Sequence, residues 1–180
     1  MALYSASVEY GLHCLLFLVD GETYASSFDL AELQGVSPAF VAKLFARLKR
    51  AGLVESLEGV GGGYRLARPA AEISVLDVVT ALEGTKPLFQ CKDIRVKCAL
   101  FGAAPPAWAS NGRCSIHAVM LEAEREMQQV LASHSLADIA TRFTRKAPKT
   151  FPVQVAAWFT ARKAGRARQA HRSPQSGVKK

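Results

Sequence analysis

The chain has 180 residues, of which 49% are hydrophobic and 21% charged, a composition that allows one globular domain with a core plus an appendage. The longest apolar run, residues 15–19, is too short to cross a bilayer, which excludes a transmembrane helix there. We expect no secretory signal, no membrane partner and a cytoplasmic location, where disulfides are rare. The four cysteines, Cys14, Cys91, Cys98 and Cys114, are then free thiols or ligands.

The net charge of +8 is unevenly distributed along the chain. Residues 145–180 carry ten Lys or Arg and no Asp or Glu, which leaves the first 144 residues with a net charge near −2. The basic character therefore belongs to the tail. Any positive surface on the folded part must come from local clustering of cations.

Hydrophobic periodicity predicts a first helix over residues 5–20, ended by Gly21, and a short second helix over residues 27–34 capped by Ser27. A third helix is expected over residues 37–51, because Ser37 is a good N-cap, Pro38 suits the first helical position and Gly52 is a typical stop. Alternating residues around glycines 61–63 then predict a β-hairpin with a flexible tip.

A fourth helix is expected over residues 75–83, with Ser74 and Asp77 in capping-box spacing. Residues 85–114 form a long loop that contains three of the four cysteines, and longer apolar periodicity predicts a helix over residues 115–133. A short helical segment over residues 136–143 follows. The Pro-, Gly- and Arg-rich tail is expected to end in disorder.

The order helix, helix, short turn, helix and hairpin is that of a winged helix-turn-helix. In the third helix Val41, Leu44, Phe45 and Leu48 are predicted to face inward, opposite a cationic face, and no acidic residue occurs between Ser37 and Val54. Such a helix can enter a major groove while its cations contact phosphates. The predicted DNA-binding residues are Ser37, Pro38, Ala39, Phe40, Lys43, Arg47 and Arg50 of this helix and Gly62, Gly63, Tyr64 and Arg65 of the wing.

The segments "SPAFVAKLFARLKRAGLVES" and "GVGGGYRLARPAAEISVLDVVTALEG" resemble the Rrf-two family of winged-helix regulators, which includes IscR-like and NsrR-like members. The resemblance covers residues 1–143. It implies a homodimer joined through the helix after the cysteine loop, and an iron–sulfur cluster held by loop cysteines. Members of the RsrR type use a Glu and a His of the first helix, in the same "VE…LHC" setting, to complete a [2Fe–2S] cluster, and Glu9 and His13 match those positions.

The predicted metal ligands are Cys91, Cys114, Cys98, Glu9 and His13. The chain keeps the first cysteine and the "CSIH" end of the family's loop but expands its middle, so that Cys91 and Cys114 are the firmer candidates. A [4Fe–4S] cluster or a zinc site of Cys91, Cys98, Cys114 and His117 are the alternatives, since thiolates suit both metals. Zinc would leave Glu9 and His13 without a role, and Cys14 is interpreted as a small buried hydrophobe.

The sequence thus predicts a mainly α fold with a small β-hairpin wing. We expect a winged helix-turn-helix domain (residues 1–84), a cluster loop (85–114), a dimerisation helix with a short following helix (115–143) and a basic tail (144–180). The expected function is that of a dimeric repressor, not an enzyme, that binds an operator in double-stranded DNA and senses redox or nitrosative stress through an iron–sulfur cluster. The alternative is a zinc-stabilised or cluster-free regulator that uses thiol chemistry.

Three interpretations of the tail remain open. It could form an amphipathic helix that docks on the core through Val155, Trp158 and Phe159, it could attach weakly to DNA, or it could be a solubilising end. Weak attachment to DNA is favoured, because the tail combines ten cations with no acidic residue.

Overall fold

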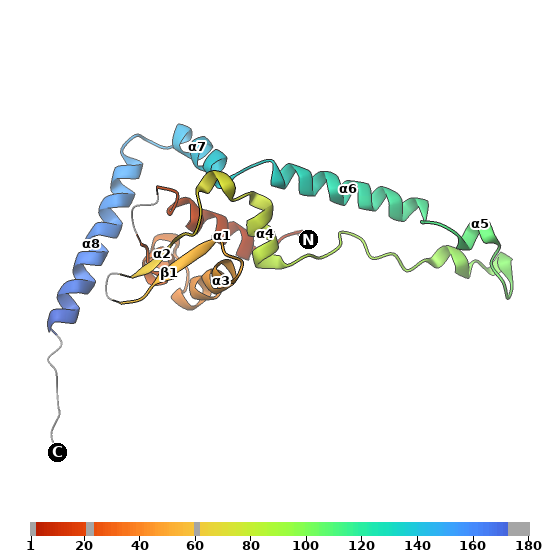
Figure 1. The fold of residues 1–180 in the computed structure, drawn as a ribbon, viewed down its shortest axis with the longest axis horizontal. Helices are drawn as coiled ribbons and strands as arrows, with labels where there is room; N and C mark the ends of the chain where they lie inside the picture. The colour runs from red at the N-terminus through yellow and green to blue at the C-terminus, as the bar shows by residue number, and fades with distance from the viewer. Residues whose placement is uncertain (1–2, 21–23, 60–61, 173–180) are drawn as a thin grey trace, which may run out of the picture. The chain divides into compact units, whose positions relative to one another are not determined.

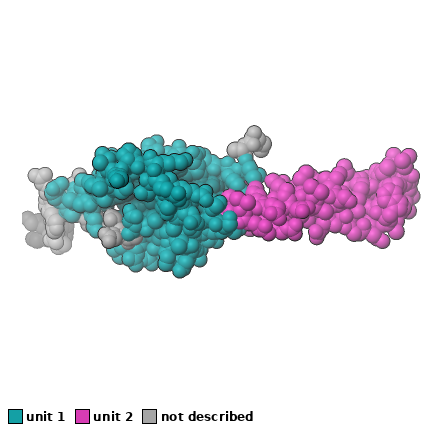
Figure 2. Space-filling model, turned by 90° about the horizontal axis from the view of Figure 1, so that it is seen from above, with its two compact units in different colours: residues 1–84, 132–180 teal, residues 85–131 magenta. Residues whose placement is uncertain are grey.

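The computed structural model describes residues 3–20, 24–59 and 62–172, which divide into two compact units. The first unit comprises Met1–Gly84 and Ala132–Lys180, and the second comprises Thr85–Leu131 (Figures 1 and 2). The predicted mainly helical fold with a two-stranded wing is confirmed. None of the described helices is long and apolar enough to cross a membrane.

The first unit begins with three helices, α1 (Ala6–Leu16), α2 (Ser27–Gln34) and α3 (Pro38–Arg50), as the sequence predicts. The end of α1 was predicted too far along the chain: after Leu16 the helix gives way to turns, and the Leu18 amide donates to the Leu15 carbonyl three residues back. This change of backbone path lets the Leu18 side chain enter the core, where it is 2% exposed. The cap of α2 is Ser26 rather than the predicted Ser27, because the Ser26 hydroxyl accepts from the Asp29 amide.

The apolar face of α3 forms the centre of the core. Its buried residues are Val41, Leu44, Phe45 and Leu48, the same four that helical spacing predicts. They pack between α1, α2, the wing and helix α4 (Val75–Glu83), which begins with the predicted capping box of Ser74 and Asp77. Because this face is buried, the opposite face of α3 is presented to solvent.

The wing consists of strands β1 (Val54–Leu57) and β2 (Gly63–Leu66), paired antiparallel from Val54 opposite Leu66 to Leu57 opposite Gly63. A bridge between Ala25 and Tyr64 joins the hairpin to the segment before α2. This close approach requires glycine at position 63, where φ is +150° and an added Cβ would lie 2.6 Å from the Ala25 carbonyl. Of the predicted tip glycines, Gly61 lies outside the described residues.

The helix α7 (Leu136–Lys146) belongs to the first unit. Its first residue, Leu136, is fully buried and its amide donates to the Ile73 carbonyl, while the Val75 amide donates to the His134 carbonyl. The starts of α4 and α7 are therefore tied together by backbone hydrogen bonds, and α7 also packs on α1. By these contacts the short helix that follows the expected dimerisation helix is part of the first unit.

The basic tail continues in helix α8 (Phe151–Arg172), which docks on the first unit as one interpretation of the tail predicts. Phe159 is 5% exposed, and Val155 and Trp158 are half-buried. Arg166 forms an ion pair with Asp29, a buried carboxylate in the first turn of α2. Arg162 pairs with Glu32 and lies 4.3 Å from the centre of the Trp158 ring.

The second unit contains the cysteine loop and the long helix α6 (Ser115–Ala132). Three short helical segments interrupt the loop, η2 (Ile94–Lys97), η3 (Ala99–Phe101) and α5 (Ala107–Ser110). No residue of α6 is buried within the described chain, and its exposed apolar side chains are Ile116, Val119, Met120 and Val130.

The buried ion pair generates a stability prediction. Arg166→Met should lower the free energy of unfolding by about 3 kcal/mol, because it leaves the Asp29 carboxylate buried without its cation. Arg162→Met is the matched control: it removes a pair whose side chains are each more than one third exposed, and it should cost less than about 1 kcal/mol. Urea unfolding followed by circular dichroism measures both values, and equal losses would contradict the prediction.

Candidate functional site

The outward face of α3 carries the predicted cations in exposed positions. Ala39, Lys43, Arg47 and Arg50 are all exposed, and Lys49 extends the same basic surface toward the wing. Three of the predicted contact residues also build the start of the helix. The Ser37 hydroxyl accepts from the Phe40 amide at 3.2 Å, Pro38 occupies the first turn, and the Phe40 ring meets Tyr10 edge-on at 5.5 Å.

Arg47 has a structural partner that its exposed position did not reveal. One of its guanidinium nitrogens donates to the Leu82 carbonyl at 2.7 Å, near the carboxyl end of α4. The side chain thus fixes α3 against α4, and it has less freedom to reach a phosphate than Lys43 or Arg50. Sequence spacing could not show this contact, because Leu82 is 35 residues away.

The wing residues are held largely by contacts within the unit. Tyr64 packs its ring 4.7 Å from that of Phe45, and Arg65 pairs with Glu55 while lying over the Tyr24 ring. The hydrogen bond to Glu55 raises the pKa of the Arg65 guanidinium. Gly62 is buried, and an added Cβ would lie 2.1 Å from the Leu57 carbonyl oxygen, so this glycine is needed for the tight turn itself.

Lys49, which is not among the predicted contact residues, joins α3 to the wing. Its ammonium donates to the Ser56 hydroxyl at 2.5 Å, and both residues line an open hollow with Gly62 and Gly63. The only sequence signal for Lys49 was its place in the acid-free basic stretch. The outward side of α3 and the wing thus combines exposed cations with a hairpin whose geometry is held by contacts inside the unit.

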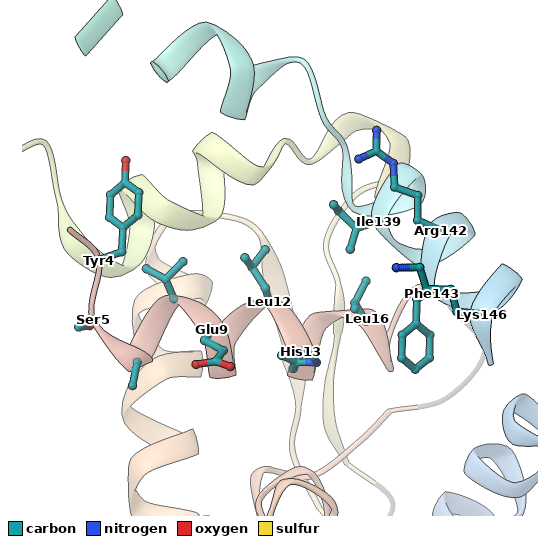
Figure 3. A pocket seen from close by; sticks show the side chains of 12 residues that line it. Tyr4, Ser5, Glu9, Leu12, His13, Leu16, Ile139, Arg142, Phe143 and Lys146 are labelled. Atoms are coloured by element: carbon teal, nitrogen blue, oxygen red, sulfur yellow. The ribbon is translucent and has the colours of Figure 1, made fainter. Parts of the chain in front are cut away.

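Glu9 and His13 lie one turn apart on the same side of α1, as their spacing predicts (Figure 3). Both are exposed and line an open hollow of about 780 Å³ between α1 and α7, which we call the α1–α7 hollow. Its other wall includes Phe143 and two cations, Arg142 and Lys146. These cations could not be assigned to the site from the sequence, because only tertiary packing brings α7 beside α1.

The cysteine loop is organised by Arg95. Its guanidinium binds the Asp93 carboxylate at 2.8 Å and donates to the backbone carbonyls of Ser110, Asn111 and Gly112. Asp93 is two residues from Cys91, and Gly112 is two residues from Cys114. This Arg95 clamp therefore holds together the two chain segments that carry the cysteines, despite the expanded sequence between them.

The three loop cysteines differ in their environments. Cys91 is half-buried and its sulfur accepts from the Asp93 amide at 3.3 Å, whereas Cys98 is exposed. Cys114 is half-buried at the amino end of α6, where the backbone amides of His117 and Ile116 donate to its sulfur and lower its pKa, with a further contribution from Arg95. Cys91 and Cys114 thus share polar, clamped surroundings that Cys98 lacks.

Within the part of the chain that is described, no three His, Cys, Asp or Glu side chains come together as a metal site. The alternative zinc site of Cys91, Cys98, Cys114 and His117 is therefore not assembled within one chain, and the His117 ring instead lies 6.1 Å from Phe89. Thiolates, a carboxylate and an imidazole are nonetheless ligands that an iron–sulfur cluster accepts. Cys91 and Cys114 lie in the second unit, and Glu9 and His13 lie on α1 of the first unit.

Comparison with known proteins gives consistent matches. The model of the Rrf2 (Rrf-two) family, described as "Iron-dependent Transcriptional regulator", matches residues 4–142. The protein aau3 of Rhizobium meliloti is 30% identical over 132 residues, 72% of this chain and 79% of that protein. The HTH-type transcriptional regulator IscR of Cereibacter sphaeroides is 39% identical over 82 residues, 42% of this chain and 53% of that protein.

Solved structures show the same fold. IscR of T. potens superimposes with a TM-score of 0.61 at 27% identity, over 82% of this chain and 93% of that one. CymR, the global cysteine regulator of B. subtilis, gives a TM-score of 0.62 at 24% identity, over 79% of this chain and 98% of that one. Among the sequence relatives, a putative HTH-type transcriptional regulator of Azotobacter vinelandii is 32% identical over 114 residues, 63% of this chain and 63% of that protein. The chain therefore spans less than two thirds of the length of that relative. The family match ends before α8.

The four thiols should differ sharply toward iodoacetamide. Cys14 is 0% exposed and burial raises its pKa to about 12, so only about one molecule in ten thousand carries its thiolate at pH 8. Cys14 should stay unmodified at pH 8, while Cys98 reacts readily. Cys114, whose pKa is lowered, should still react as the pH falls below 8. Mass spectrometry of the native, metal-free protein measures each site; rapid alkylation of native Cys14 would contradict its burial.

Proposed function

Because the chain belongs to the Rrf2 family of transcriptional regulators, we propose that it is a homodimeric repressor that senses redox or nitrosative stress through an iron–sulfur cluster. The observation that supports this most directly is the division of donors. Cys91 and Cys114 lie in the clamped loop, while Glu9 and His13 face an open hollow on α1. Each pair is an incomplete ligand set by itself.

The DNA-binding step rests on α3 and the wing. We propose that the amino-terminal half of α3 enters the major groove, where Ala39 lies nearest the bases, and that Lys43, Lys49 and Arg50 contact phosphates. Arg47, bound to Leu82, then acts mainly by fixing the helix. Gly62, Gly63, Tyr64 and Arg65 shape the wing that lies beside the duplex.

The proposed dimer interface lies on α6. Two of its apolar residues, Ile116 and Val119, are 64% and 62% exposed within the described chain. An exposed apolar stripe of this kind is typical of a helix that packs against a partner. Two recognition helices can then read half-sites about 34 Å apart, so a shift of a few ångströms between subunits weakens binding.

The proposed ligand set is Cys91 and Cys114 of one subunit with Glu9 and His13 of the other. When bound, an iron–sulfur cluster supplies a one-electron redox change that is sensitive to its protein ligands. The Arg95 clamp holds together the two loop segments that carry these thiolates. Glu9 and His13 belong to α1, which packs on α3, α4 and α7. Loss of these ligand bonds would free α1 and the loop to shift, and α1 contacts the recognition helix directly.

A cluster-free thiol sensor is the second candidate. It is favoured by the lowered pKa of Cys114 and by the exposure of Cys98. Among the related structures is an oxidized form of S. aureus CymR, with a TM-score of 0.55 at 27% identity. In this alternative, oxidation of the loop thiols replaces the cluster as the signal.

Binding to duplex DNA should show the role of the α3 cations. Lys43→Gln should weaken binding and reduce the slope of log K against log salt concentration by about one, because one phosphate contact is lost. Lys97→Gln, which removes an exposed cation of the cysteine loop, should leave the slope unchanged. Fluorescence anisotropy at several salt concentrations measures both. An unchanged slope for Lys43→Gln would contradict the proposed docking.

Mixing two defective variants tests the cluster and its division between subunits. After anaerobic reconstitution, His13→Ala and Cys114→Ala homodimers should both lack visible absorption, iron and sulfide. Heterodimers formed by co-expression should regain about half of the wild-type content, because one site then draws His13 from one chain and Cys114 from the other.

The possible results separate the alternatives. No cluster in the wild-type protein would defeat the proposal and leave the thiol sensor. A cluster in the wild type without recovery in heterodimers would place all ligands in one chain. Cys98→Ala serves as the control: retention of the cluster there excludes the exposed thiol from the ligand set.

A further inference from the structure

A second, smaller cavity lies between the end of α1, helix α7 and the first half of α8. Its volume is about 230 Å³, and we call it the α8 cavity. Four aromatic rings line it, those of Phe17, Phe143, Phe151 and Phe159. Ligand pockets in proteins are typically lined in this way, by apolar and aromatic side chains with a few polar groups that fix orientation.

This cavity depends on a helix that the family match does not include. The matched region ends at residue 142, whereas α8 begins at Phe151 and supplies Phe159 and Val155 to the wall. The helix is held in place by its ion pairs with α2, one of them to the buried Asp29. The α8 cavity is therefore a built feature of this chain rather than a general property of the fold.

The polar groups at the cavity indicate the class of ligand. Among the described residues that line the cavity, Asp20 is the only one with a formal charge at pH 7. Two further polar groups lie at the wall, the His13 imidazole and the Thr144 hydroxyl. The Thr144 hydroxyl already donates to the Ala140 carbonyl at 2.9 Å, which leaves its oxygen free to accept. A carboxylate and an accepting hydroxyl favour a ligand with an ammonium or N–H group and disfavour an anion.

We propose that the α8 cavity binds a small effector with one aromatic ring and an amino group. The ring packs among the phenylalanines, and the amino group faces Asp20. Three residues, His13, Leu16 and Phe143, line both this cavity and the α1–α7 hollow, so that occupancy of the cavity acts on His13 directly. The binding step does not depend on an iron–sulfur cluster, and the metal-free protein tests it.

Isothermal titration of the full-length, metal-free protein with 2-phenylethylamine tests the site, with phenylacetate as the anionic probe of similar shape. The amine should bind saturably and at least about tenfold more tightly than phenylacetate, and Asp20→Asn should remove that preference. In proton NMR, the His13 imidazole resonances, assigned with His13→Gln, should shift during the titration because an aromatic ring enters next to them.

Two valine-to-tryptophan variants on α8 test where the ligand binds. Val155→Trp fills the cavity and should abolish binding, whereas Val153→Trp, at a position 70% exposed, should preserve it. If Val155→Trp fails to fold by circular dichroism, Ala140→Phe fills the cavity from α7 instead. Absence of saturable amine binding to the wild type, equal binding to a filled variant, or equal affinity for phenylacetate would each overturn the proposal. A failure here would leave the cluster hypothesis untouched.

Discussion

Burial of one face of α3 determines most of what the DNA-binding unit can do. Val41, Leu44, Phe45 and Leu48 are each at most 2% exposed, and they hold together the three-helix core and the wing. Because an α-helix repeats every 3.6 residues, burying these four leaves Ala39, Lys43 and Arg50 on the opposite side. The same packing that stabilises the fold therefore also turns the basic face of α3 toward solvent.

Around this core, several residues with apparent functional roles act as supports. Ser37 caps α3, Arg47 fixes it to α4, and Tyr64 packs on Phe45 behind the wing. A rigid recognition surface is useful in a regulator, since a small relative movement of two such surfaces can then change operator affinity. Local flexibility within each surface would weaken that coupling.

The proposed sensing parts differ from the core in two respects: their long helix is not buried, and their proposed ligands are not assembled into a metal site. Helix α6 has no buried residue of its own, and no three His, Cys, Asp or Glu side chains gather as a metal site within the described chain. The Arg95 clamp nevertheless gives the expanded cysteine loop a defined arrangement through one charged side chain and several backbone carbonyls. A unit that is ordered internally but exposes apolar and thiol groups is suited to completion by a second copy.

The sequence alone determined the elements whose signals are local. The order of the helices, the four buried residues of α3, the capping box of α4 and the burial of Cys14 all follow from periodicity and capping, which involve residues within a few positions. The spacing of Glu9 and His13 likewise fixed their common side of α1. Long-range packing decided the rest. The Leu82 carbonyl binds Arg47, helix α7 places Arg142 and Lys146 on the wall of the hollow that Glu9 and His13 also line, and Asp29 holds the basic tail on the fold through Arg166. Each of these contacts joins residues dozens of positions apart, and its free energy depends on burial and on the partner's exact place, neither of which a one-dimensional pattern contains.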